Sequence, residues 1–289
     1  MPIILTSTDG SIYAPSVYKN AAWAAKRLSA SIEVLHVLDH HREHSPMTDL
    51  TGAIGLDATA ELTEELTKLE EAQGRVARLK GQAILEDARR QFVDAGITNV
   101  TTTQRHGTLL ETLEEFEPRA ELVVVGKGGV PAGAPNSSLG GHLEELVRIS
   151  IRPVLVAKRV FKPIKKFLIA FDNSPSARKA VDFAVSSPLL KGLDCSLVMV
   201  GRNDAPHEAT LNKVQAQLKD AEFNVIVKRL PGSAAVVIAK EVKDTDADLL
   251  VMGAYGHSHI REFIVGSTTT KLVRSCSAPV LMFQSKLQH

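Results

Sequence analysis

The sequence has little cysteine and no long apolar segment. Only two cysteines occur in 289 residues, Cys195 and Cys276, and both stand among apolar residues. Two isolated thiols support neither a disulfide framework nor a zinc ribbon, so we expect a reducing, cytoplasmic setting. No apolar run approaches the roughly 18 residues of a membrane span. The N-terminal residues lack the basic region and cleavage site of a signal peptide, so we expect no export and no membrane partner.

Net charge is also nearly absent. The chain has 34 basic and 33 acidic residues, which gives a formal net charge of +1, and neither sign gathers in long runs. Proteins that bind nucleic acid usually carry a basic stripe, so we expect no nucleic-acid partner. A chain of this length most naturally holds two domains, each able to bury its own core.

Short apolar runs alternate with helical segments along the whole chain. The expected strands are 3–5, 32–38, 100–104, 121–126, 153–156, 167–171, 197–200, 223–228, 249–252 and 279–283. This alternation predicts parallel sheets with helices on both faces, and right-handed crossovers make such sheets doubly wound. We therefore predict an α/β protein with two doubly wound parallel five-stranded sheets. Because the fifth strand opens with Pro153, we expect it near a sheet edge.

The second half of the sequence repeats the order of the first. Asp9 and Ser11 align with Asp172 and Ser174 at one constant offset, and the later pairs align at a shorter offset. The first copy is longer because it carries a polar loop and a long helix, which we expect to span roughly residues 60–95. The sequence is thus a tandem duplication with one insertion. The predicted domains are residues 1–159 and 164–285.

A glycine-rich stretch near the C-terminus organises the second copy. Its fourth strand ends at Gly253, Gly256 follows, and nine further residues lead to Gly266-Ser267-Thr268, where a helix should begin. Glycine allows close backbone approach, and a helix N-terminus offers free N–H groups and the positive end of its dipole. The stretch therefore suits an anion such as phosphate. Asp172 would line the same crevice if the strands before it and before Gly253 are neighbours.

These motifs together resemble a known family. Asp172-x-Ser174, a second strand ending at Val200, and Gly253-x2-Gly256-x9-Gly266-Ser267-Thr268 resemble the ATP-binding form of the universal stress proteins. The resemblance covers almost the whole chain as two tandem copies. It implies an adenine nucleotide alpha hydrolase-like fold and two copies packed as an intramolecular pseudo-dimer along their last strands, at 154–156 and 280–283. A further homodimer is also compatible with it.

The resemblance also implies a ligand and its contacts. The ligand would be an adenine nucleotide, ATP, with Mg2+ as a possible companion, bound in the second copy. Asp172 would meet the sugar or base, and Ala170 and Val200 would supply contacts around adenine. The residues implied around ribose and phosphates are Gly253, Gly256, Gly266, Ser267 and Thr268, with His257 as a further phosphate contact.

The first copy departs from this pattern. It reads Gly126-Lys127-Gly128-Gly129, then ten residues, then Gly140-Gly141, so its spacer is longer and Gly141 replaces the serine. Backbone N–H groups and Lys127 are still compatible with an anion there. We nevertheless expect one good nucleotide site in the chain, in the second copy.

Motifs for metal binding and catalysis are weak. The histidines His36, His40, His41 and His44 match no closed zinc site, so we expect a solvated loop and no metal. The sequence has no G-x-x-x-x-G-K-[ST] and no G-x-S-x-G signature, and we assign no catalytic residue. The expected function is a stress response through ligand-dependent signalling or protection, with an unknown protein partner. The alternatives are a slow ATPase or phosphotransfer enzyme at the same site, and a scaffold that binds no nucleotide.

Overall fold

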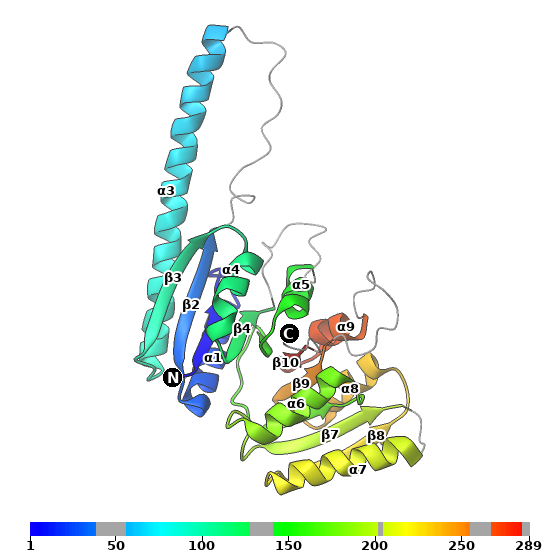
Figure 1. Ribbon diagram of the computed structural model, residues 1–289. Helices are drawn as coiled ribbons and strands as arrows, with labels where there is room; N and C mark the ends of the chain where they lie inside the picture. Colours follow the sequence, from blue (N-terminus) through cyan, green and yellow to red (C-terminus); the bar gives the residue numbers. More distant parts are fainter. Residues whose placement is uncertain (39–55, 128–140, 202–204, 255–266, 285–289) are drawn as a thin grey trace.

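A computed structural model describes residues 1–38, 56–127, 141–201, 205–254 and 267–284. In this part of the chain ten strands form one continuous sheet with helices on both faces (Figure 1). The prediction of two five-stranded parallel halves is confirmed. The two halves also join edge to edge, because the last strand of each pairs with the last strand of the other.

The first half contains, in chain order, β1 (Ile3–Ser7), α1 (Ala14–Leu28), β2 (Ser31–Leu38), α3 (Leu56–Asp94), β3 (Val100–His106), α4 (Leu109–Phe116), the 3-10 turn η1 (Glu117–Arg119), β4 (Leu122–Gly126), α5 (Gly141–Ile149) and β5 (Val154–Ala157). The second half contains β6 (Lys166–Ala170), α6 (Pro175–Ser186), β7 (Asp194–Val200), α7 (Ala205–Asp220), β8 (Val225–Leu230), α8 (Ala234–Asp244), β9 (Leu249–Gly253), α9 (Ser267–Ser275) and β10 (Val280–Phe283). Apart from η1, the two lists repeat the same order of elements, as the duplication predicts.

Each half is doubly wound. The strand order across the sheet is β3-β2-β1-β4-β5-β10-β9-β6-β7-β8, and neighbouring strands within each half run parallel. The chain moves outward from β1 to β3 and then returns to the other side of β1 with β4. The same reversal occurs between β6 and β9. Ligands of such sheets bind beyond the carboxyl ends of the strands at this reversal.

The two halves meet at β5 and β10, which run antiparallel. Leu155 lies opposite Leu281 at the centre of this pairing. The predicted contact between the last strands is confirmed. The expectation that Pro153 marks a sheet edge is wrong for the whole sheet, since β5 lies between β4 and β10. Proline is tolerated because it stands just before the strand, where its carbonyl oxygen accepts the N–H of Val123 at 3.0 Å.

Two hydrophobic cores fill the space between the sheet and its helices. One core lies under α1, α3, α6 and α7, and the other lies under α4, α5, α8 and α9. Each core contains buried side chains from both halves, and neighbouring residues of the junction strand β10 alternate between them: Leu281 belongs to the first core, and Val280 and Met282 to the second. The apolar packing is therefore continuous across the junction on both faces.

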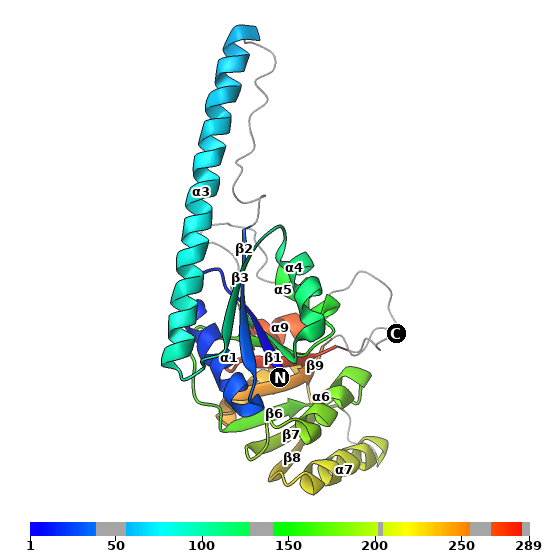
Figure 2. The same cartoon turned by 60° about the vertical axis from the view of Figure 1, so that its left-hand side comes forward.

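The inserted helix α3 is 39 residues long, whereas its counterpart α7 has 16. It begins at Leu56, somewhat before the expected residue 60. Its C-terminal part packs on β2, β3 and α1, and its N-terminal part extends far beyond the sheet (Figures 1 and 2). The contact with β3 is present at Arg78, whose carbonyl oxygen accepts a hydrogen bond from Gln104 Nε2 at 3.4 Å. It is tightest at Gly81, where an added Cβ would lie 2.7 Å from the His36 ring and 2.3 Å from the Gln104 side chain. A side chain at this position would push the helix away from the sheet.

Candidate functional site

The residues expected around a ligand in the second half lie at one edge of the sheet. Ala170 ends β6, Val200 ends β7 and Gly253 ends β9, and Asp172 follows β6 by two residues. β6 lies between β7 and β9 and runs parallel to both, with Ala170 beside Met252. The carboxyl ends of all three strands therefore meet, and the expected neighbourhood of the Asp172 and Gly253 strands is confirmed.

Asp172 shapes the turn that leads into α6. Its Oδ1 accepts hydrogen bonds from the backbone N–H of Ser174 at 3.0 Å and from the Ser174 hydroxyl at 2.5 Å. Ser174 in turn caps α6, since its Oγ accepts the N–H of Ala177 at 3.2 Å, and Pro175 occupies the first turn. Serine is a favoured N-cap residue, and proline suits the first turn of a helix.

The first half contains the same turn. Asp9 Oδ1 accepts the N–H of Ser11 at 2.9 Å, and Gly10 adopts φ +67° where Asn173 adopts φ +63°. An aspartate at this position therefore has a structural role in both halves, whether or not a ligand is present. α1 differs at its start, because its first residue is Ala14 and its N-cap Tyr13 makes no side-chain capping bond.

Gly253 is a glycine for a reason that the sequence analysis missed. A Cβ at this position would lie 2.4 Å from the Ser176 hydroxyl and 2.6 Å from the backbone nitrogen of Ala177. Real Cβ atoms do not approach other atoms so closely, so any side chain would displace the first turn of α6. Close packing of β9 against α6 thus explains this glycine without a phosphate. The contact joins residues far apart in sequence, so no local pattern reveals it.

The rest of the expected phosphate-binding stretch is described only at its ends. β9 ends at Gly253 and α9 begins at Ser267, so the predicted order of strand, loop and helix is confirmed. Gly256, His257 and Gly266 lie outside the described residues. Ser267 and Thr268 form the first turn of α9 with their backbone.

Lys127 has a different partner from the one we considered. The sequence suggested that it assists an anion in the first half, but its Nζ donates a hydrogen bond to the carbonyl oxygen of Arg274, in the last turn of α9. Burial, together with the nearby charge of Lys158, lowers the pKa of Lys127 to about 8. This ammonium group therefore links the two halves of the chain.

His36 belongs to the core and not to a metal site. It is 8% exposed, and its Nδ1 lies 2.8 Å from the carbonyl oxygen of Thr8. Because a carbonyl only accepts, Nδ1 carries the proton. His40, His41 and His44 lie outside the described residues, and the described part of the chain holds no cluster of three or more residues suited to a metal ion.

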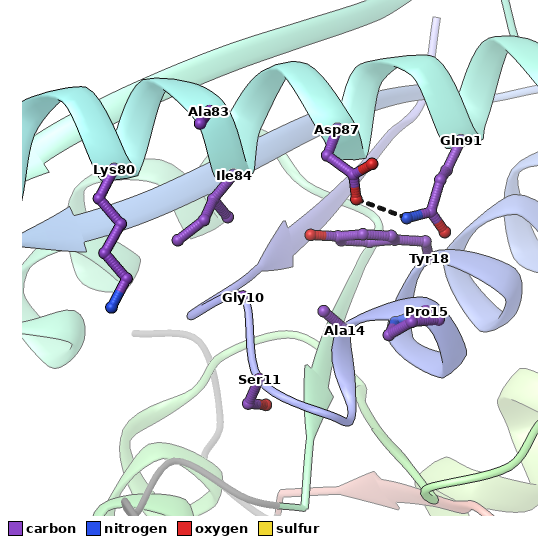
Figure 3. A pocket seen from close by; sticks show the side chains of 10 residues that line it. All are labelled: Gly10, Ser11, Ala14, Pro15, Tyr18, Lys80, Ala83, Ile84, Asp87 and Gln91. Atoms are coloured by element: carbon purple, nitrogen blue, oxygen red, sulfur yellow. Dashed lines mark hydrogen bonds between the residues drawn. The ribbon is translucent and has the colours of Figure 1, made fainter.

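A pocket that the sequence analysis did not predict lies in the first half, between the start of α1 and the middle of α3 (Figure 3). Its volume is about 320 Å3, and its lining residues are Gly10, Ser11, Ala14, Pro15, Tyr18, Lys80, Ala83, Ile84, Asp87 and Gln91.

Two polar groups of this pocket already have hydrogen-bond partners. Tyr18 Oη lies 2.7 Å from the Thr8 hydroxyl, and Gln91 donates to Asp87 at 2.6 Å. Burial raises the pKa of Tyr18 to about 12. The pocket depends on the inserted helix, so the duplicated pattern alone gives no sign of it.

The helices of the described residues include none that is long and apolar enough to cross a membrane. Both cysteines are free and buried.

Comparison with known proteins agrees with this fold. A sequence model of the universal stress protein family matches residues 1–158 and 199–284. Universal stress protein Slr1230 of a Synechocystis strain is 36% identical over 287 residues, which cover 98% of this chain and all of that protein. The chain belongs to the universal stress protein family. The family model leaves out the stretch that contains Asp172.

Solved structures show the same fold over the full length. A universal stress protein from Archaeoglobus fulgidus superposes with a TM-score of 0.71 at 18% identity and covers 98% of both chains. A Pseudomonas aeruginosa protein described as functionally unknown superposes with a TM-score of 0.57 at 17% identity, over 98% of this chain and 92% of its own. At these identities the likeness shows the fold alone.

Proposed function

We propose that the protein binds an adenine nucleotide, ATP, at the carboxyl ends of β6, β7 and β9, and that it acts in a stress response by ligand-dependent signalling or protection. The observation that carries this proposal is the convergence of three strand ends at the point where the winding reverses. There Asp172 and Gly253 lie at the ends of neighbouring strands, and the G-x2-G-x9-G-S-T stretch leads from β9 to the first turn of α9.

The chemistry of the residues supports specific roles. Ala170 and Val200 are partly exposed apolar residues at strand ends, which suits contact with a flat base. Asp172 carries a carboxylate able to accept hydroxyl groups of a ribose. The N-terminus of α9 suits a phosphate because its N–H groups and helix dipole favour negative charge. The proposed phosphate contacts are Gly256, His257, Gly266, Ser267 and Thr268, and a Mg2+ ion would accompany the phosphates.

We further propose that the chain consists of two domains, residues 1–159 and 164–285, arranged as an intramolecular pseudo-dimer. The antiparallel pairing of β5 with β10 supports this arrangement, because these are equivalent strands of the two copies. Two subunits related by a twofold axis pair in the same way. Only the second domain would bind the nucleotide. In the first domain Lys127 is engaged by α9, and Gly141 stands where the second domain has Ser267.

A scaffold that binds no nucleotide is the second candidate. It is favoured by the turn at Asp172 and by the packing at Gly253, since both explain a motif residue without a ligand. Mass spectrometry of the intact purified protein, before and after incubation with ATP and Mg2+, separates the two. A bound adenine nucleotide at one per chain supports the proposal. Absence of any nucleotide adduct, with no calorimetric signal for ATP, favours the scaffold. If a hydrolysis assay with ATP and Mg2+ shows sustained multiple turnovers, the protein is an ATPase.

A further inference from the structure

Helix α3 extends beyond the sheet, and the last residues before Gly81 contact the rest of the described chain: the Arg78 carbonyl oxygen accepts a hydrogen bond from Gln104 Nε2 at 3.4 Å, and Lys80 lines the pocket at Gly10. The buried side chains of α3, Leu85, Ala88 and Phe92, all follow Gly81. Ahead of Gly81 the helix continues away from the sheet (Figures 1 and 2). We call residues 62–80 the projecting segment.

The projecting segment carries an apolar stripe with the spacing of a coiled coil. Leu62, Leu66, Leu69, Gln73, Val76 and Lys80 follow one another at alternating steps of four and three residues. Four of these six residues are apolar, and Leu62, Leu69 and Val76 are 36%, 53% and 66% exposed. Most helical stability in proteins comes from packing of an apolar face, and a stripe with this repeat is suited to pack against a second helix.

Charge is divided along the same segment. The exposed acidic residues come first and are Glu64, Glu65, Glu70 and Glu71; the exposed basic residues come last and are Arg75, Arg78 and Lys80. The one basic residue in the acidic part, Lys68, pairs within its own helix with Glu64 at 2.9 Å and Glu65 at 3.0 Å. The segment thus has an acidic part followed by a basic part.

We propose that the projecting segment is a dimerisation helix, which pairs antiparallel with the same segment of a second copy of this chain. Antiparallel pairing places the acidic part of each helix along the basic part of the other, whereas parallel pairing would place like charges together. The chain itself therefore supplies the complementary partner.

The proposed register is the one in which the two segments overlap over their full length. Leu62 lies opposite Lys80 of the second copy, Leu66 opposite Val76, and Leu69 opposite Gln73. The long stem of Lys80 covers Leu62 while its ammonium group reaches the glutamates beside it. The pairing involves fewer than three heptads, so the dimer depends on concentration.

Sedimentation velocity on the full chain tests this inference with a matched pair of variants. Val76→Asp changes a valine of the stripe that is 66% exposed, and Val236→Asp changes a valine of α8 that is 68% exposed. We expect a dimer for the unchanged protein and for Val236→Asp. For Val76→Asp we expect the dimer dissociation constant to rise by about a hundredfold or more, because each dimer would bury two unpaired carboxylates. A monomer in the unchanged protein at all concentrations, or a dimer unaffected by Val76→Asp, overturns the proposal.

Charge reversal is a second test, which leaves the four apolar residues of the stripe unchanged. One variant carries Arg75→Glu, Arg78→Glu and Lys80→Glu, and the other carries Glu64→Lys, Glu65→Lys, Glu70→Lys and Glu71→Lys. Each variant alone should be a monomer, because both parts of the helix then carry charge of the same sign. An equimolar mixture should form dimers again. Dimers of either variant alone, or monomers in the mixture, contradict the role of charge.

Cysteine cross-linking determines the orientation. Leu62→Cys and Lys80→Cys place one thiol each at opposite ends of the projecting segment, and the two native thiols are buried. In the antiparallel register a mixture of the two variants forms a disulfide-linked dimer under mild oxidation, whereas each variant alone does not. Cross-linking of either variant with itself would show parallel pairing and overturn the proposed arrangement.

Discussion

Lys127 Nζ donates a hydrogen bond to the carbonyl oxygen of Arg274, in the other half of the chain. Lys127 directly follows β4, and Arg274 lies in the last turn of α9. The last carbonyl oxygens of a helix have no partner within the helix, so the Lys127 donor satisfies one of them. The first half therefore supports the helix whose opposite end carries the proposed phosphate contacts of the second half.

The pKa of Lys127 predicts a pH dependence of stability. Burial and the Lys158 charge lower this pKa from its ordinary value of 10.5 to about 8. Between pH 8 and 10.5 the unfolded chain then binds more protons at this residue than the folded protein, so its contribution to stability rises with pH. We expect the free energy of unfolding of the unchanged protein, minus that of Lys127→Met, to increase with pH across this window. Urea unfolding at a series of pH values measures the difference, and a constant difference would contradict the lowered pKa.

The cysteines should be unreactive in the folded protein. Cys195 is 1% exposed and Cys276 is completely buried. Burial raises the pKa of the Cys195 thiol to about 12 and also raises that of Cys276. Because the thiolate is the reactive form, we expect an aromatic disulfide reagent to label neither thiol until the protein unfolds. Two equivalents of label should appear in denaturant. Rapid labelling of one thiol in the native protein would show that its surroundings open.

The sequence predicted the order of the elements well because the apolar periodicity is local. The strand ends at Val200 and Gly253 and the long inserted helix were all expected from nearby residues. The pairing of Leu155 with Leu281 was expected only from the family resemblance.

Contacts between distant residues were not predictable in this way. Lys127 and Arg274 are 147 residues apart in the sequence, and nothing near either residue indicates their hydrogen bond. The pocket at Gly10 and Ile84 likewise depends on where the inserted helix crosses α1. The sequence pattern around Gly253 indicates a ligand, whereas the structure adds a packing explanation through Ser176.

The packing at Gly253 predicts a loss of stability on substitution. Gly253→Ala would place a methyl group 2.4 Å from the Ser176 hydroxyl. Overpacking of this kind typically costs about 1–3 kcal/mol, so we expect a loss of that size in the free energy of unfolding. Gly201→Ala is the matched control, because it also follows a strand of the second half and its Cβ would meet nothing within 4 Å. Equal effects of the two substitutions in urea unfolding would contradict the close contact.

Substitution of Asp9 or Asp172, which occupy equivalent turns in the two halves, should lower the free energy of unfolding. Asp9→Ala removes the hydrogen bond to the Ser11 N–H, and Asp172→Ala removes two hydrogen bonds to Ser174. At roughly 1 kcal/mol for each bond, both variants should remain folded, with Asp172→Ala the less stable. Thermal unfolding of the two variants checks this order, and a larger loss for Asp9→Ala would contradict it.

Titration calorimetry of ATP with these two variants tests whether the second half binds the nucleotide. We expect one ATP per chain for the unchanged protein and for Asp9→Ala, with similar affinity. For Asp172→Ala we expect an affinity lower by about tenfold or more, because a hydrogen bond to a charged group is lost. No binding to the unchanged protein, or an equal loss of affinity in both variants, would contradict a nucleotide site in the second half.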